Sequence, residues 1–466
     1  MPEVIPQISQ DEFEALRILS YAEVATEILA KFVGDEMPKD DLARIMNDTF
    51  TLWEDPETVV VPLKKVNDFY VAELFHGPSW SFKDFGQQML CKLIDYFAVK
   101  RDVPCNLVVS TTGDTGPAAI AAVLACKRLK IVCTYPEGQI SDLQERQIIT
   151  PVSPNVNAVS YQAGGDDMDL PIKNLVTDST FARQYGLGSV NSINIGRVAS
   201  QVINYVWSYL ELLRRGKVGS EGVIFSIPTG AMGNIAAGYL ANRMGVPVKK
   251  FIVGTNNNDI SHRVIATGLF HKRDMVRTKS EAINIQVPYN FERMLYLLSD
   301  SDTGLISKSY AGPKGMEKTG QIDLDTHLMD RLQDKFVSFR VSDERMIETI
   351  QTFYKRYDYL SDPHTAVALC AAEKTVGDAE TAPVVVFSTA HPCKFAEAIT
   401  EAFGQDFWLR YKQSKAMPKA AAALYSAPRA PSFRSFTRPD DESIEDAQVR
   451  WEKNQREMIV SPEAGA

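Results

Sequence analysis

The sequence lacks the features by which several classes of protein are recognised. Its six cysteines form no C-x-x-C pair and its six histidines show no zinc-ligand spacing, so we expect reduced thiols and no metal site. No apolar run is long enough to span a bilayer. The first twenty residues have neither the apolar core of a secretory signal nor the composition of a transit peptide. These absences predict a cytoplasmic protein without a membrane partner.

Positive charge is also in deficit. The 466 residues include 50 Lys and Arg against 59 Asp and Glu, which gives a formal net charge of −9. A surface of this sign repels polyanions, so we expect no nucleic-acid partner, and any anionic ligand needs a local site. The chain contains neither G-x-x-x-x-G-K-[ST] nor G-x-G-x-x-G, which disfavours nucleotide binding.

Apolar strands that alternate with helices are abundant instead. The pattern of strand, helix and strand occurs over 106–135 ("NLVVST" to "KIVCTY") and again over 222–255 ("GVIFSI" to "VKKFIVGT"). Further apolar stretches at 58–63, 69–75 and 382–389 also predict strands. Buried strands joined through helices are typical of parallel sheets, and the length allows two such sheets. The sequence therefore predicts an α/β protein.

The two ends of the chain have other patterns. Residues 9–50 predict helices, one of which opens with Ser20 and Glu23 at capping-box spacing. Residues 413–440 are rich in Ala, Pro and Ser, which is typical of a flexible arm. A short charged helix is expected over 443–458.

Two turns that follow predicted strands have compositions suited to anions. "STTGDTG" (110–116) offers hydroxyls and glycines, and "PTGAMGN" (228–234) lets the backbone approach a ligand closely. Ligands of open α/β sheets bind where strands end and helices begin. Either turn could also be a tight connection without a ligand.

One lysine, Lys83, lies in an apolar, turn-rich stretch, "HGPSWSFKDFG" (76–86), between Trp80 and a predicted helix. Apolar surroundings penalise an ammonium and favour the neutral amine, which a lysine needs in order to attack a carbonyl. A lysine that lies along the surface near a helix start is the alternative.

Together these segments resemble the threonine synthase family of pyridoxal phosphate enzymes. The resemblance covers about residues 3 to 410, and the segments that carry it are "ELFHGPSWSFKD" (73–84), "TTGDTG" (111–116), "NSINIGR" (191–197), "IPTGAMGNIAAGY" (227–239) and "STAHPCKF" (388–395). It implies an α/β, fold type II enzyme similar to the tryptophan synthase beta chain. Such a fold has two open, mostly parallel sheets with helices on both faces, here with N-terminal helices and a C-terminal extension.

The domain prediction combines this resemblance with the composition. We expect an N-terminal helical segment (1–65), a large cofactor-binding domain (66–103 and 205–412), a small α/β domain (104–204) and a flexible C-terminal tail (413–466).

The resemblance implies pyridoxal 5'-phosphate as the cofactor. Lys83 is then the Schiff-base lysine, and the cofactor-binding residues are Lys83, Thr229, Gly230, Ala231, Met232, Gly233, Asn234 and Thr389. Thr389 matches the family position that meets the pyridine nitrogen, where a hydroxyl does not keep that nitrogen protonated. A plain residue at a strand end is the alternative for Thr389.

The resemblance also implies two places for the substrate. The turn Thr111, Thr112, Gly113, Asp114 and Thr115 matches the cradle of the α-carboxylate, and Asn191, Asn194 and Arg197 fall in the segment tied to the substrate phosphate. The planar fork of an arginine suits a phosphate. An exposed salt bridge is the alternative for Arg197 and a helix cap for Asp114. Lys394 is a further candidate for a phosphate contact.

The function implied is elimination of phosphate from O-phospho-L-homoserine, followed by addition of water to give L-threonine. Two alternatives stay open: a catabolic phospho-lyase that releases 2-oxobutyrate from O-phosphohomoserine or O-phosphothreonine, and a binding protein without catalysis. Residues 256–263 and 283–302 resemble the threonine synthase-like phospho-lyases of animals, whereas 388–395 is closer to the biosynthetic enzymes.

Two residues depart from the family pattern, since Ile195 replaces the usual tryptophan and Thr112 the usual serine.

The expected partner is a small phosphorylated amino acid, and the expected state is a monomer or homodimer.

Overall fold

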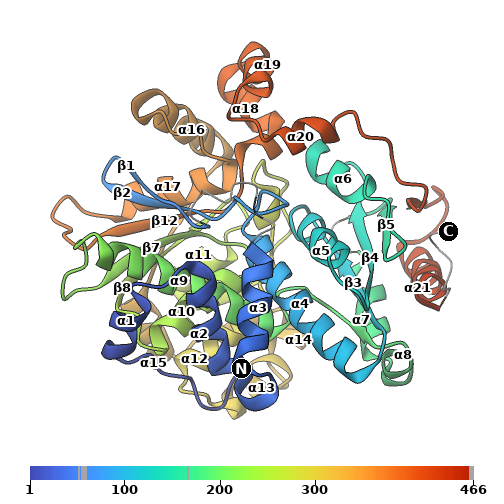
Figure 1. The fold of residues 1–466 in the computed structure, drawn as a ribbon, viewed down its shortest axis with the longest axis horizontal. Coiled ribbons are helices and arrows are strands. Elements are labelled where there is room, and N and C mark those ends of the chain that lie inside the picture. The colour runs from blue at the N-terminus through green and yellow to red at the C-terminus, as the bar shows by residue number, and fades with distance from the viewer. Residues whose placement is uncertain (51–52, 54–59, 165–166, 461–466) are drawn as a thin grey trace. The chain divides into compact units, whose positions relative to one another are not determined.

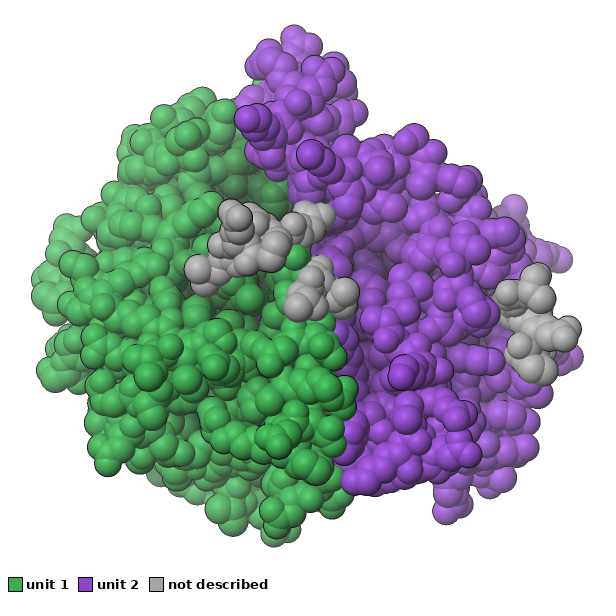
Figure 2. Space-filling model, in the orientation of Figure 1, with its two compact units in different colours: residues 1–76, 198–392, 397–404 green, residues 77–197, 393–396, 405–466 purple. Residues whose placement is uncertain are grey.

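The computed structural model describes residues 1–50, 53, 60–164 and 167–460 (Figure 1). The chain forms two compact units, which Figure 2 colours separately. Unit 1 contains residues 1–76, 198–392 and 397–404, and unit 2 contains residues 77–197, 393–396 and 405–466.

Unit 1 is built on a six-stranded sheet in the order β1-β2-β12-β7-β8-β11. Its strands are β1 (Leu63–Val66), β2 (Phe69–Glu73), β12 (Val384–Ser388), β7 (Val223–Pro228), β8 (Val248–Thr255) and β11 (Phe336–Arg340). Only β1 and β2 pair antiparallel, and the other neighbours are parallel. Every residue of β7 and β12 is buried, as expected for the middle of a parallel sheet. A separate pair joins β9 (Leu269–His271) to β10 (Gln321–Asp323).

The helices of unit 1 include the predicted N-terminal group. They are α1 (Gln10–Leu16), α2 (Tyr21–Val33), α3 (Lys39–Phe50), α10 (Gly233–Arg243), α11 (Ile260–Thr267), α12 (Phe291–Leu298), α13 (Thr303–Tyr310), α14 (Met316–Thr319), α15 (Thr326–Lys335), α16 (Asp343–Tyr357), α17 (Pro363–Thr375) and α18 (Ala396–Phe403). Helix α9 (Ile195–Arg214) begins in unit 2 and continues in unit 1. Ser20 and Glu23 form the expected capping box at the start of α2. Short 3-10 helices cover Gly34–Glu36, Glu281–Ile283 and Pro392–Lys394.

Unit 2 is built on a five-stranded sheet in the order β13-β5-β4-β3-β6, in which all neighbours are parallel. Its strands are β13 (Arg434–Phe436), β5 (Val156–Tyr161), β4 (Leu129–Pro136), β3 (Cys105–Ser110) and β6 (Leu187–Gly188). Its helices are α4 (Lys83–Arg101), α5 (Thr115–Leu124), α6 (Asp142–Ile149), α7 (Asp169–Thr177), α8 (Ser179–Gln184), α19 (Gln405–Gln413), α20 (Lys419–Leu424) and α21 (Ile444–Val460).

Both strand–helix–strand patterns expected from the sequence are present. They correspond to β3–α5–β4 in unit 2 and β7–α10–β8 in unit 1, and the expected strand over 382–389 is β12. The strand expected over 58–63 falls partly on residues 54–59, outside the described residues, and the paired strand β1 starts only at Leu63. Each of the two glycine-containing turns therefore follows a parallel strand and opens a helix.

The division into units differs from the predicted domains in several places. Residues 77–103, expected with the large domain, belong to unit 2, because α4 packs against α5. Residues 413–460, predicted as part of a flexible tail, contain strand β13, which extends the unit 2 sheet, and helix α21, which packs against α7. The physical reason is an amphipathic stripe on α21, in which Ala447, Trp451 and Ile459 are buried.

Over the described ranges no helix combines the length and apolar character needed to cross a membrane. In the same ranges no group of three or more His, Cys, Asp or Glu side chains is arranged to hold a metal ion.

Candidate active site

Lys83 is the first residue of α4, and the loop that leads into it is closely packed. A Cβ on Gly77 would lie 2.6 Å from Asp84 Oδ2, so this position requires glycine. The backbone N–H of Ser79 donates to the same oxygen at 2.8 Å. Trp80 has a φ of +55°, a left-handed conformation that is uncommon for a bulky side chain. Such strain concentrates at functional sites, where the surrounding structure holds it in place.

The surroundings of Lys83 favour its neutral amine. Burial lowers the pKa of Lys83 to about 8, the negative charge of Asp114 opposes this, and the positive charges of Arg197 and Lys394 add to it. Lys83 Nζ lies 4.1 Å from the centroid of the Phe82 ring, a contact that favours the charged form and so acts against the effect of burial. The residue as a whole is half-buried, while its amine is enclosed enough for burial to be the main cause of the lowered pKa. These are the properties required of a nucleophilic lysine.

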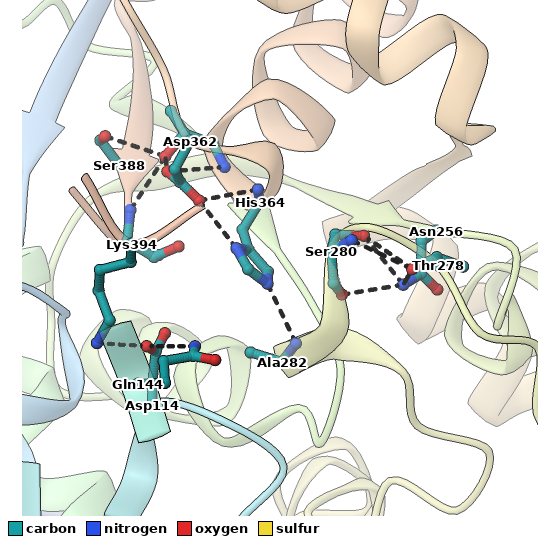
Figure 3. A network of polar contacts seen from close by, with 12 residues as sticks. Asp114, Gln144, Asn256, Thr278, Ser280, Ala282, Asp362, His364, Ser388 and Lys394 are labelled. Atoms are coloured by element: carbon teal, nitrogen blue, oxygen red, sulfur yellow. Dashed lines mark hydrogen bonds and ion pairs between the residues drawn. The ribbon is translucent and has the colours of Figure 1, made fainter. Parts of the chain in front are cut away.

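Asp114 lies beside Lys394 in unit 2, although the two residues are far apart in the sequence. Lys394 Nζ lies 2.7 Å from Asp114 Oδ1, and both side chains are buried. Gln144 Nε2 donates to the same oxygen at 3.0 Å (Figure 3). Asp114 occupies the cap position of α5, yet its side chain makes no capping hydrogen bond. The alternative of a helix cap is therefore wrong, because the carboxylate pairs with Lys394 and accepts a hydrogen bond from Gln144 instead.

The turn after β3 is organised by Thr111. Its buried hydroxyl accepts hydrogen bonds from the N–H groups of Gly113 at 3.1 Å and Gly116 at 3.0 Å. Gly113 has a φ of +149°, and a Cβ there would lie 2.8 Å from Gln144 Nε2. Thr112 and Thr115 are only half-buried. Thr111 thus shapes the turn, while Thr112 and Thr115 remain partly accessible.

Arg197 and the two asparagines before it belong to unit 2 as well. Arg197 is buried rather than exposed, so a surface salt bridge does not describe it, and its Nη1 donates to the Val190 carbonyl at 2.8 Å. A Cβ on Gly86 would collide with the Nε atom of Arg197, so glycine at this position leaves room for the guanidinium. Asn194 Oδ1 accepts from the Gly196 N–H at 3.0 Å, and Asn191 Nδ2 donates to the Ser110 carbonyl at 3.4 Å. The asparagines hold the segment that carries the guanidinium.

The second turn, in unit 1, exposes backbone groups rather than charged side chains. A Cβ on Gly230 would lie 2.8 Å from Ile283 Cα, so only glycine fits there. Met232 has a φ of +60° and precedes α10, whose first turn has no side-chain cap. Thr229 donates through its hydroxyl to the Ile227 carbonyl at 3.0 Å, and Asn290 Nδ2 holds the Ala231 carbonyl at 2.9 Å. An uncapped helix start behind a glycine turn is suited to a phosphate.

Thr389 follows β12 and is held by a buried network within unit 1. Its N–H donates to Thr365 Oγ1 at 3.2 Å, and that hydroxyl also contacts Asp362. Asp362 Oδ1 lies 2.9 Å from His364 Nδ1, and His364 Nε2 accepts from the Ala282 N–H at 3.2 Å (Figure 3). His364 is thereby held with its proton on Nδ1. The network links Thr389 to the segment that contains Ile283, the neighbour of Gly230.

Comparison with known proteins places the chain in a family. The family described as threonine synthase N terminus matches residues 1–50, and that described as threonine synthase, C-terminal, matches residues 365–444. Threonine synthase of Schizosaccharomyces pombe is 33% identical over 433 residues, which cover 86% of this chain and 83% of that protein. Threonine synthase-like 2 of Homo sapiens is 34% identical over 407 residues, with the same two coverages, 86% and 83%. The chain belongs to the threonine synthase family.

Structural comparison agrees with this membership. The crystal structure of pyridoxal phosphate-bound threonine synthase from Brucella melitensis matches with a TM-score of 0.87 at 30% identity, over 99% of this chain and 93% of that one. The predicted family, fold class and enzyme class are confirmed. Since this family consists of enzymes, the alternative of a binding protein without catalysis is set aside.

The residues present fit pyridoxal phosphate, the ligand of the Brucella protein. In unit 1, Gly230 has no side chain at a position where a Cβ would collide with the backbone of Ile283. The buried Nδ2 of Asn234 has no hydrogen-bond partner among the described residues. In unit 2, Lys83 provides an amine with a lowered pKa for an aldehyde. Each feature matches one functional group of that cofactor.

Sequence reasoning missed several residues that support these positions. Gln144, Ser79, Asp362, His364 and Thr365 were given no role. Gln144 contacts Asp114, Thr365 contacts Thr389, and Ser79 belongs to the loop before Lys83. Asp362 in turn contacts Thr365 and His364. One local signal was available for Asp362, because Asp followed by Pro is typical of a helix start, and Asp362 does cap α17. The contacts of Gln144 depend on packing between segments and left no local signal.

Proposed function

We propose that the protein converts O-phospho-L-homoserine and water into L-threonine and phosphate. The observation that carries this proposal is Lys83, a lysine whose pKa burial lowers to about 8 and whose electrostatic surroundings include Arg197 and the Asp114–Lys394 pair. The cofactor is pyridoxal 5'-phosphate, and the reaction is that of a carbon–oxygen lyase acting on phosphate.

Lys83 is the general base of the proposed reaction. Pyridoxal phosphate, when bound, supplies the electron sink that stabilises negative charge at the Cα of the substrate. The neutral amine of Lys83 removes the Cα proton and can return a proton at a neighbouring carbon. At pH 7 a pKa of about 8 leaves about a tenth of the amine neutral, whereas an unperturbed pKa near 10.4 would leave less than about a thousandth.

The remaining residues bind anions. We assign the substrate α-carboxylate to the turn from Thr111 to Thr115, whose backbone and hydroxyl groups are suited to donate to it. Arg197, positioned by Asn191 and Asn194, is assigned to the leaving phosphate, where a cation stabilises the developing charge. This role requires the guanidinium to turn from the Val190 carbonyl toward the ligand.

In unit 1 the roles belong to the cofactor. We assign the ring nitrogen of the cofactor to the hydroxyl of Thr389. We assign its phosphate to the turn formed by Thr229, Gly230, Ala231, Met232, Gly233 and Asn234. A hydroxyl at that nitrogen leaves it unprotonated, which limits the electron withdrawal of the ring and favours controlled elimination.

A second candidate is a phospho-lyase that releases 2-oxobutyrate, ammonia and phosphate from O-phosphohomoserine or O-phosphothreonine. It is favoured by the likeness to Homo sapiens threonine synthase-like 2, which is 34% identical where the Schizosaccharomyces pombe enzyme is 33% identical. Both reactions share the proton removal at Cα and the loss of phosphate. They differ in whether water adds at Cβ before the product leaves.

We further propose that the protein acts in the cytoplasm as a monomer or homodimer. Its ligands are small molecules, and neither a nucleic acid nor a membrane takes part.

The proposal is tested with the purified protein, pyridoxal phosphate and O-phosphohomoserine, by measuring phosphate, threonine and 2-oxobutyrate in one reaction. Equal amounts of phosphate and threonine are expected. Equal amounts of phosphate and 2-oxobutyrate would establish the second candidate instead, and no phosphate release would refute both.

Two variants assign the chemistry to Lys83. Lys83→Ala is expected to lower turnover by at least about 10²–10⁴-fold and to abolish the covalent link to the cofactor. Lys249→Ala is the matched control, because Lys249 pairs at the surface with Glu221 and Glu380 and should leave turnover unchanged. Turnover that survives in Lys83→Ala would remove this residue from the mechanism.

A further inference from the structure

Lys394 has no role in the proposed chemistry, yet its buried ion pair with Asp114 lies in the electrostatic surroundings of Lys83. The charged groups that face Lys83 are Asp114 at the start of α5, Arg197 in α9 and Lys394 in the 3-10 helix Pro392–Lys394, and its chain neighbour is Asp84. One negative and two positive charges therefore act on a single amine. Whether that amine holds a proton depends on their balance.

Lys394 is fixed by two contacts within unit 2. Its Nζ lies 2.7 Å from Asp114 Oδ1 and donates to the Ser79 carbonyl at 2.8 Å, and none of its side chain is exposed. Gln147 Nε2 donates to the same carbonyl at 3.2 Å. Ser79 belongs to the loop that leads to Lys83, and its N–H binds Asp84. Lys394 therefore holds the loop on the side that precedes the reactive lysine.

Asp114 is also fixed from the other side. Gln144 Nε2 donates to Oδ1 at 3.0 Å, and the backbone of Gln144 is set by its capping box with Ser141. Gly113 leaves the space that the Gln144 amide occupies. A buried carboxylate is stable only when it is paired and hydrogen-bonded, and here Lys394 supplies the charge and Gln144 a hydrogen bond.

We infer that Lys394 is a positioning residue for Lys83. It neutralises Asp114, which would otherwise attract a proton to the amine of Lys83, and it anchors the Ser79 carbonyl and with it the loop 77–82. The assignment of the reactive amine rests on the proposed function, but the electrostatic effect is a property of the protein alone. Lys394 is thus not a phosphate ligand in this arrangement.

The test measures the protonation of Lys83 directly in the protein without cofactor. Trace labelling with acetic anhydride is carried out from pH 6 to pH 11, and mass spectrometry gives the fraction of Lys83 acetylated. Lys394→Met is expected to raise the labelling midpoint of Lys83 by about one pH unit or more, because it leaves Asp114 unopposed. Asp114→Asn is expected to lower the midpoint by about one unit, and the double variant is expected to return it toward that of the parent.

The opposite signs separate this role from a merely structural one. Damage to packing would shift both single variants in the same direction, and that result, like an unchanged midpoint in either, overturns the inference. If Lys394→Met does not fold, as judged by circular dichroism, Asp114→Asn and the double variant still decide, because the inference requires the double variant to have the higher midpoint. Lys249→Met is the control and should keep the parent midpoint.

Hydrogen exchange provides the second measurement. The amides of residues 77–82 should exchange faster in Lys394→Met and at the parent rate in Lys249→Met, and unchanged exchange in Lys394→Met would contradict the anchoring role. Shifts of the expected sign in a protein that releases no phosphate from O-phosphohomoserine would refute the proposed function and leave this inference standing.

Discussion

The surroundings of Lys83 in unit 2 and those of the Gly230 turn in unit 1 use the same local architecture for different purposes. In each unit a parallel strand ends in a glycine turn that opens a helix, β3 before α5 and β7 before α10. The turn in unit 2 is surrounded by ionisable side chains, several with shifted pKa values. The turn in unit 1 offers backbone groups, hydroxyls and a glycine packed against Ile283.

This difference supports the proposed division between proton transfer in unit 2 and cofactor binding in unit 1. Ionisable groups whose charge is tuned by burial can move protons, whereas fixed backbone dipoles can hold an anion without changing their own charge. Substitutions in unit 2 should therefore alter dependence on pH, and substitutions in unit 1 should alter cofactor affinity or stability at every pH.

The largest expected effect concerns Asp84 in unit 2. Burial raises the pKa of Asp84 to about 7, although hydrogen bonds from Ser79 and the charge of Lys394 oppose this. The folded protein then holds a proton that the unfolded chain releases near pH 4, so stability should fall as pH rises from about 4 to 7, by about 1.4 kcal/mol per pH unit. Urea unfolding at several pH values should show this loss in the parent and a flatter profile in Asp84→Asn. Parallel profiles in the two proteins would contradict the prediction.

The second effect tests the network of unit 1. Asp362→Ala removes the acceptor for His364 and Thr365 and the cap of α17, and should lower the free energy of unfolding by about 2–4 kcal/mol. The matched control is Asp325→Ala, which removes an exposed cap of α15 with one hydrogen bond and should cost about 1 kcal/mol. Equal losses measured by chemical denaturation would show that the buried network adds nothing to the cap.

Gly230→Ala should mainly affect the cofactor. Its Cβ would lie 2.8 Å from Ile283 Cα, and the displacement of backbone this requires should weaken pyridoxal phosphate binding by about 1–3 kcal/mol, or roughly 5–150-fold in Kd. The labelling midpoint of Lys83 should not change. Gly219→Ala, where nothing lies within 4 Å of the added Cβ, is the control. A changed labelling midpoint of Lys83 in Gly230→Ala would contradict the expectation that substitutions in unit 1 leave the protonation of Lys83 unchanged.

The smallest effect is expected at Gly113. An alanine there must adopt a φ of +149° and displace the flexible end of Gln144, at a cost of about 1 kcal/mol. We expect KM for O-phosphohomoserine to rise by roughly fivefold while Kd for pyridoxal phosphate is unchanged. Gly377→Ala, which has open space around its Cβ, serves as the control. A raised Kd for pyridoxal phosphate with an unchanged KM would instead indicate that the turn at Gly113 binds the cofactor.

Much of the fold could be predicted from local pattern. The N-terminal capping boxes, the apolar strands and the two glycine turns are all readable from short stretches, because capping, burial and turn formation depend on neighbouring residues. The composition of the tail after residue 412 suggested flexibility, while the buried stripe of Ala447, Trp451 and Ile459 on α21 could be recognised only with its partner surface.

The candidate site shows the same limit more sharply. Lys83, Arg197 and Thr389 were predicted from residues and family resemblance, and the surroundings of each came only from the structure. Asp114 was predicted to lie in the carboxylate cradle, with a helix cap as the alternative, and its ion pair with Lys394, far away in the sequence, was not foreseen. No local rule connects two residues so far apart, because their pairing depends on how the elements of unit 2 pack.

The sequence by itself determined the α/β class, the two glycine turns and the choice of Lys83 as the proposed reactive lysine. These follow from periodicity, from the glycines that come after predicted strands, and from the family resemblance of the stretch around Lys83. Only the tertiary structure decided that Lys83 is poised to lose its proton, since burial and the charges of Asp114, Arg197 and Lys394 act through space rather than along the chain.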